Sequence, residues 1–126
     1  MNGVSTGCFI SPMPFPEAVG STRIGRVDGK FIAFPTHEQL EDSDMDVIVS
    51  GTKAAVTMIE GFAREVSEDD MFAAIEFAHD TIKEVIELQE ELYSKVNPKK
   101  DEFTACLLYT SPSPRDQRGS RMPSSA

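Results

Sequence analysis

One long helical repeat of apolar residues, which runs from Met71 to Val96, constrains the fold of this chain more than any other feature. Spacings of four and three residues alternate along it, so all members lie on one side of a helix of about seven turns. The members are Met71, Ile75, Ala78, Ile82, Val85, Gln89, Leu92 and Val96. A stripe of this length needs an equally long apolar surface to cover. We therefore expect a helix that packs along one face of a β-sheet.

Both ends of this helix are marked in the sequence. Ser67 is a favourable N-cap residue, and the acidic run 68–70 complements the positive end of the helix dipole. Lys95 suits the last turn, and Pro98 cannot continue the helix. These signals predict a helix that begins just after Ser67 and ends shortly before Pro98.

A tight β-hairpin is expected near the start of the chain. Asp28-Gly29 separates two extended runs, 19–27 and 30–34, and this dipeptide readily adopts the positive φ angles of a two-residue turn. Pro35-Thr36 closes the second strand, and residues 37–40 suit a short helical turn with Thr36 as its cap.

A second hairpin follows, with strands at 46–50 and 56–62 joined by residues 51–55. Alternation and β-branched residues favour strands there. Residues 2–10 suit a helix end that leads into a proline-rich turn. Two hairpins followed by a long C-terminal helix predict an α+β fold in which the helix covers one sheet face.

The composition argues against two kinds of function for this chain alone: nucleic-acid binding and membrane association. The formal charge of −9 argues against a nucleic-acid-binding surface on this chain alone, because phosphate recognition needs clustered Lys and Arg. No apolar run is long enough to span a membrane, so we expect no membrane association and a cytoplasmic location. Cys8 and Cys106 have neither metal-ligand nor redox-motif spacing.

The acidic stretch before the second hairpin imitates a calcium loop without completing it. Asp42, Asp44 and Asp46 have the opening spacing, but Val47 replaces the required Gly and Lys53 replaces the final Glu. We therefore expect no calcium site and interpret the stretch as a solvated loop.

Other candidate groups have ordinary structural explanations. His79 adjoins the apolar stripe and is expected to be partly buried and satisfied rather than a metal ligand. Phe72 and Phe77 could form a docking face, but aromatic residues at helical spacing are more often core. Arg23 and Arg26 could contact a polyanion, although two basic residues are weak evidence in so acidic a chain.

The last residues differ in character from the rest. Residues 106–126 read CLLYTSPSPRDQRGSRMPSSA, without apolar periodicity, as in a disordered tail. The segment also resembles a translated frame of the adapters used in DNA library preparation. We therefore divide the chain into residues 1–105, which we expect to be natural protein, and residues 106–126, which we expect to be a non-native disordered tail.

The order and spacing of many short motifs in residues 2–103 resemble the polynucleotide phosphorylase family. The motifs are Pro14-Phe15, Val19-Gly20, Arg23-Ile24-Gly25, Val27-Asp28-Gly29, Pro35-Thr36, Asp44-Met45-Asp46-Val47, Val49-Ser50-Gly51-Thr52, Val56, Met58-Ile59-Glu60 and Ser67-Glu68-Asp69. The resemblance implies that residues 1–105 are the C-terminal portion of an RNase PH-like (ribosomal protein S5 domain 2-like) domain. It also implies a homotrimeric ring that degrades RNA from its 3′ end with inorganic phosphate, releasing nucleoside diphosphates with Mg²⁺ as cofactor, and contacts with RNA-degradosome components.

The family has two such repeats. In the active one, five residues separate an Asp from a second Asp, and one residue separates the second Asp from a Lys. Aligned through Asp44-Met45-Asp46, this chain has Leu40, Asp46 and Ile48 at those positions. Leu cannot bind a metal, and Ile cannot supply positive charge to a phosphate. The resemblance therefore implies the first, non-catalytic repeat, with no catalytic residue and no metal bound by this chain.

Two alternatives stay open. Catalytically empty RNase PH-like proteins also occur as structural subunits of exosome-like rings, which this chain could represent. An unrelated small acidic binding protein would instead form a stable monomer from residues 1–105 alone.

Overall fold

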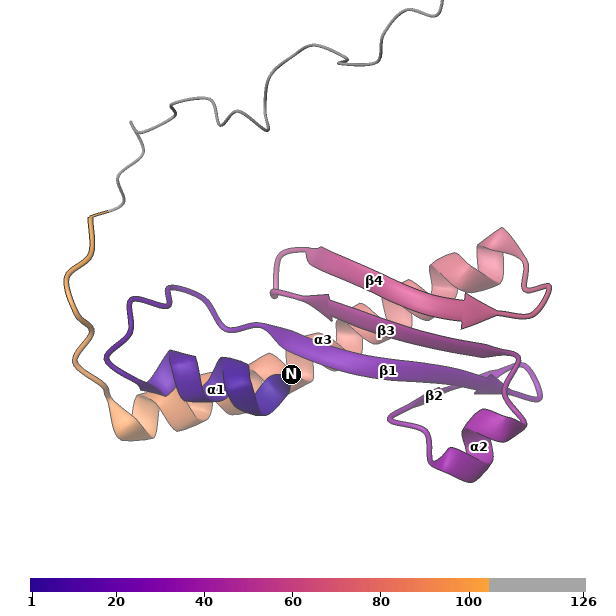
Figure 1. The fold of residues 1–126 in the computed structure, drawn as a ribbon, viewed down its shortest axis with the longest axis horizontal. Coiled ribbons are helices and arrows are strands. Elements are labelled where there is room, and N and C mark those ends of the chain that lie inside the picture. The colour runs from indigo at the N-terminus through magenta and orange to yellow at the C-terminus, as the bar shows by residue number, and fades with distance from the viewer. Residues whose placement is uncertain (105–126) are drawn as a thin grey trace, which may run out of the picture.

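The computed structural model describes residues 1–104 and contains one four-stranded antiparallel sheet with three helices (Figure 1). The elements are α1 (Asn2–Ile10), β1 (Gly20–Val27), β2 (Lys30–Ala33), α2 (His37–Glu41), β3 (Met45–Gly51), β4 (Val56–Ala63) and α3 (Glu68–Val96). Strand order in the sheet is β2-β1-β3-β4. The predicted α+β class, both hairpins and the long helix are confirmed, whereas the adapter-like segment 106–126 lies outside the described residues.

The first hairpin turns where the sequence predicts. Asp28 and Gly29 have φ angles of 52° and 76°, as a two-residue turn with positive φ at both positions requires. Thr36 caps α2: its hydroxyl accepts from the backbone N–H of Gln39, whose side chain accepts from the backbone N–H of Thr36. Interactions between residues close in sequence therefore determine the conformation of the first turn and of the start of α2.

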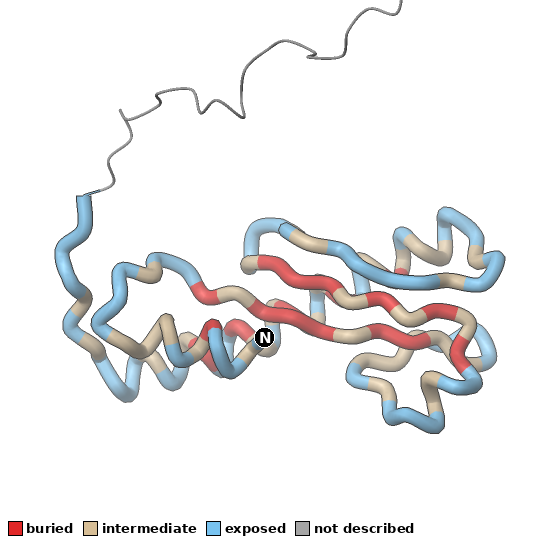
Figure 2. The backbone as a smooth tube through the Cα atoms, viewed as in Figure 1, coloured by how far each residue is buried: buried red, intermediate tan, exposed pale blue. Residues whose placement is uncertain are grey.

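The core lies between the sheet and α3, which runs behind the strands (Figures 1 and 2). Its largest fully buried side chains come from β1, β3 and α3: Ile24, Met45, Val47, Val49, Ile82 and Ile86. Gly20 allows β1 to approach the helix, because a Cβ at this position would lie 2.9 Å from Cγ2 of Ile82. The helix and the sheet consequently pack in direct contact along the first strand.

The buried side of α3 differs from the predicted stripe. Ala78, Ile82 and Gln89 are buried as expected, but Ala74 and Ile86 are buried as well. Leu92 and Val96 are 38% and 48% exposed. The C-terminal part of α3 extends past the end of the sheet, and α1 is the described helix or strand that lies beside it there (Figure 1), so within residues 1–104 Leu92 and Val96 have no strand to cover them. Among the described helices, none is both long and apolar enough to cross a membrane.

A buried polar network joins α1 to α3. The Ser5 hydroxyl donates to Oε1 of Gln89 at 3.0 Å and accepts from the backbone N–H of Val19 at 2.9 Å. Gln89 returns a hydrogen bond from Nε2 to the Val19 carbonyl at 3.0 Å. Each polar group is satisfied, which explains how Gln89 can be only 4% exposed within an apolar stripe.

Candidate functional site

The three positions implied by the family resemblance are only partly brought together by the fold. Asp46 and Ile48 are two residues apart on β3, so both side chains lie on the sheet face opposite α3. There they line one shallow hollow of about 300 Å³. Leu40 lies on α2 and is not one of the residues that line this hollow.

The Asp46 carboxylate is occupied by an arginine. Arg23 of β1 donates from Nε to Oδ1 at 2.6 Å and from Nη2 to Oδ2 at 2.5 Å, a bidentate pair. These bonds hold the pKa of Asp46 below its ordinary value and raise the pKa of Arg23. The carboxylate is therefore ionised, but both of its oxygens already have a cationic donor.

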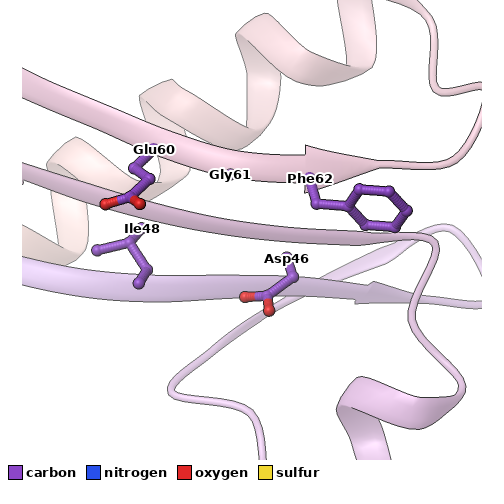
Figure 3. A pocket seen from close by; sticks show the side chains of 5 residues that line it. All are labelled: Asp46, Ile48, Glu60, Gly61 and Phe62. Atoms are coloured by element: carbon purple, nitrogen blue, oxygen red, sulfur yellow. The ribbon is translucent and has the colours of Figure 1, made fainter.

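The rest of the hollow comes from β4 (Figure 3). Glu60 lies opposite Ile48 in the strand register, and Phe62 lies opposite Asp46. Gly61 permits the close strand approach, because a Cβ there would lie 2.8 Å from the Asp46 carbonyl oxygen. The hollow thus combines two carboxylates with aliphatic and aromatic side chains.

A second arginine holds a second acid pair. Arg26 contacts Asp44 through Nη2 at 2.6 Å and Asp70 through Nη1 at 2.8 Å, while its own side chain is 15% exposed. Arg26 holds the pKa of Asp44 below the ordinary value, and the pKa of Asp70 is lowered by hydrogen bonds from Ser67 and Arg26. This arrangement links β1, the start of β3 and the first turn of α3, as a structural clamp.

Neither acid cluster suits a divalent cation. Mg²⁺ needs carboxylate oxygens that are free to coordinate, usually beside the phosphates of a substrate. Both oxygens of Asp46 are bound by Arg23, and Arg26 bridges the other two acids. Ile48, where the resemblance implies a lysine in the active repeat, supplies no charge. Within the described residues 1–104, these two clusters therefore do not fit Mg²⁺, the cofactor that the family resemblance implies.

The structure also tests the predictions made for His79 and for the phenylalanines of α3. His79 is partly buried, and its Nε2 lies 3.0 Å from the Thr52 carbonyl oxygen, which confirms a satisfied structural histidine. The expectation that Phe72 belongs to the core is wrong, because it is 62% exposed. Phe77 is 37% exposed and stacks on Phe31 at 5.9 Å between ring centroids.

The sequence reasoning missed both arginine–aspartate pairs. The sequence did contain a signal for these pairs. Two basic residues, Arg23 and Arg26, lie on one expected strand, and two acidic residues, Asp44 and Asp46, lie at the start of another. The match becomes visible only when β1 is known to pair with β3, with Gly25 opposite Asp46. Both arginines therefore bind carboxylates within the fold.

Comparison with known proteins agrees with this architecture. Residues 17–81 match the model of the 3′ exoribonuclease family, domain 2. The chain therefore belongs to this family, and its sheet with one covering helix corresponds to the RNase PH-like C-terminal fold.

Within the family, the chain is similar to polyribonucleotide nucleotidyltransferases. It is 58% identical to that of Rhodopirellula baltica over 103 residues, which is 82% of this chain and 14% of that protein. It is 53% identical to that of Thermotoga neapolitana over 97 residues, or 77% of this chain and 14% of the relative. These relatives confirm the resemblance to polynucleotide phosphorylase, and the chain spans only 14% of their length.

Proposed function

We propose that residues 1–105 are the C-terminal portion of the first, non-catalytic RNase PH-like repeat of a polyribonucleotide nucleotidyltransferase. In this proposal the repeat helps to assemble the ring and to form the RNA channel. The complete protein degrades RNA from its 3′ end by phosphorolysis in the cytoplasm, as a Mg²⁺-dependent homotrimer with RNA and phosphate as substrates and degradosome proteins as further partners.

One observation carries the assignment to the non-catalytic repeat. At the positions where the active repeat has two carboxylates and a lysine, this chain offers Leu40 on a separate helix, Asp46 bound by Arg23, and Ile48. Phosphoryl transfer needs positive charge placed at the phosphate and a coordinated metal ion. This group of residues supplies neither.

The proposal predicts that the chain is inactive by itself. Incubated with polyadenylate and inorganic phosphate in the presence of Mg²⁺, the purified chain should release no ADP above a buffer control, whereas an active polyribonucleotide nucleotidyltransferase assayed in parallel should. Phosphate-dependent release of ADP by this chain would contradict the assignment to the empty repeat.

A second assay tests the same assignment in the complete protein encoded by the extended gene. The double variant Arg23→Gln with Asp46→Asn keeps hydrogen-bonding groups at both positions and removes their charges. Because Asp46 is proposed to hold no metal, phosphorolysis should stay within about twofold of the wild-type rate. A loss comparable to that caused by replacing an acid of the second repeat would exclude the proposal.

Sequencing of the gene separates the remaining alternatives. A polyribonucleotide nucleotidyltransferase predicts a second repeat with the complete acid and lysine set downstream, whereas a structural subunit of an exosome-like ring predicts none. The similarity to bacterial polyribonucleotide nucleotidyltransferases favours the first. The same experiment tests our proposal that residues 106–126 are translated adapter, since independent clones should then diverge from the present sequence after the Ala105 codon.

A further inference from the structure

The first helix, α1, has little in its own sequence that keeps it helical. It is nine residues long, and isolated helices of this length are marginal in water. Gly3 and Gly7 lie inside it, and each glycine disfavours a helix about fivefold relative to alanine. Within the described residues, α1 has no side-chain cap at Met1, no acid in its first turn and no base in its last turn. Contacts with the rest of the chain must therefore hold α1 in its helical conformation.

The amino end of α1 is held by the side chain of Asn2. Its amide oxygen accepts from the backbone N–H of Ser21 at 2.7 Å, and its Nδ2 donates to the Ser21 carbonyl at 2.9 Å. β2 pairs with β1 at residues 24–27, so the Asn2 amide takes the place of a strand partner at Ser21. Water can replace the amide at these two backbone groups, because hydrogen bonds to protein and to water differ little in net free energy.

The middle of α1 rests on a polar position of α3. Ser5 is the buried residue of α1, and it bonds to Gln89, which interrupts the apolar stripe of α3. An apolar residue at position 89 would lose free energy when it became exposed to water. The Gln89 amide can be hydrated instead. This surface of α3 is therefore suited to lose its contact with α1 and to regain it.

The carboxyl end of α1 makes its contacts beyond the end of the sheet (Figure 1). Lys100 donates to the Phe9 carbonyl at 2.6 Å, and the Phe9 ring stacks on Tyr93 with 4.5 Å between ring centroids. Both rings belong to half-buried residues. The largest fully buried side chains come instead from β1, β3 and α3, so the centre of the core does not depend on α1.

We propose that α1 is a detachable helix, which opens and closes as a unit while the sheet and α3 stay folded. In the open state the contacts of Asn2, Ser5 and Lys100 are broken and their partners are hydrated. The edge of β1 at Ser21 and the polar position of α3 at Gln89 then become accessible to water. Segments held by few buried apolar contacts commonly open in this way without global unfolding. The motion does not depend on the proposed enzymatic function.

Hydrogen exchange of the 126-residue chain in a urea series tests the opening. The backbone N–H of Ser11 donates to the Gly7 carbonyl at 3.1 Å and reports on α1, whereas the amides of β3 report on the core. Ser11 should be protected at least about tenfold less than the amides of β3. Because local opening exposes little surface, exchange at Ser11 should hardly depend on dilute urea, whereas exchange in β3 should accelerate steeply. Equal protection and equal urea dependence at both places would overturn the proposal, because α1 would then open only with the whole fold.

Three variants test the same opening without denaturant. Ser5→Ala removes a contact between α1 and α3 and should accelerate exchange at Ser11 about fivefold. The matched control is Thr6→Ala, whose lost hydroxyl bonds to the Asn2 carbonyl within the same helix, and it should cause no acceleration. Ile24→Val removes a methyl group from the core and should accelerate exchange in β3 several-fold while leaving Ser11 within about twofold. Equal effects of Ser5→Ala and Thr6→Ala, or equal acceleration at Ser11 and in β3 in Ile24→Val, would contradict a detachable helix.

Discussion

Within residues 1–104, the Thr22 hydroxyl is the buried side-chain group that has no hydrogen-bond partner. Thr22 lies on β1 and is 2% exposed. Ser50, on the neighbouring strand, is 3% exposed, but its hydroxyl donates to Oγ of Ser21 at 2.9 Å. Two hydroxyls of similar burial therefore differ in whether a hydrogen bond offsets the free energy of desolvation.

This difference predicts opposite effects of removing the two hydroxyls. Thr22→Val should raise the free energy of unfolding by about 1 kcal/mol, because the unpaired hydroxyl is replaced by a methyl group of similar shape. Ser50→Ala should lower it by a similar amount. Urea denaturation followed by circular dichroism measures both. If Thr22→Val destabilised the chain as much as Ser50→Ala, the hydroxyl would have a partner.

At the scale of elements, Lys100 connects the chain after α3 to the end of α1. Nζ of Lys100 donates to the carbonyl oxygens of Phe9, Ser11 and Met13 at 2.6, 2.9 and 3.0 Å. The same ammonium lies 5.7 Å and 5.6 Å from the ring centroids of Phe9 and Tyr93. Because the last carbonyls of a helix carry partial negative charge, Lys100 acts as a cap for α1 from a distant part of the chain.

The cap predicts local rather than global stabilisation. The backbone N–H of Asp101 donates to the Pro12 carbonyl at 2.8 Å, so its hydrogen exchange reports on this contact. Lys100→Met keeps an apolar stem but removes the ammonium, and exchange at Asp101 should become much faster while the amides of β3 stay protected. Lys99→Met, at the exposed neighbouring position, is the control and should change neither. Equal exchange at Asp101 in both variants would contradict the cap.

For the whole molecule, the arginine–aspartate pairs couple folding to pH. Asp44, Asp46 and Asp70 all have pKa values below the ordinary one, caused by Arg26 for Asp44, by Arg23 for Asp46, and by Ser67 with Arg26 for Asp70. The unfolded chain therefore binds protons at these acids before the folded chain does as the pH falls. Their contribution to stability is complete above the unfolded pKa and is lost as the pH falls through the lower, folded values.

We accordingly expect the melting temperature to fall steadily as the pH is lowered from about 5 to about 2. Thermal denaturation followed by circular dichroism measures this dependence. Asp46→Asn should melt at a lower temperature near neutral pH. Its melting temperature should also change less with pH in acid, because one of the three carboxylates with a lowered pKa is absent. A melting temperature that is highest near the acidic end of this range would contradict the role of the pairs.

The sequence by itself determined the elements whose causes are local. Asp28-Gly29 sets the first turn, Thr36 with Gln39 caps α2, and Ser67 begins α3, since each depends on groups within a few residues. The family and the α+β class also followed from the sequence, through the order of its motifs. The proposed replacement of an acid by Leu40 and of a lysine by Ile48 was also inferred from the sequence alone, because it depends on residue types and not on geometry.

Only the tertiary structure decided how these elements face one another. The strand order fixed which arginine meets which aspartate, and Asp46 became a partner of Arg23 rather than a solvated acid. Which residues of α3 are buried also depends on the extent of the sheet. Ile86 packs in the core, whereas Leu92 lies beyond the end of the sheet and is exposed. Helical periodicity defines a stripe only to within a residue or two, whereas burial depends on surfaces supplied by distant strands. Contacts between such distant segments are non-local, and no short stretch of sequence contains them.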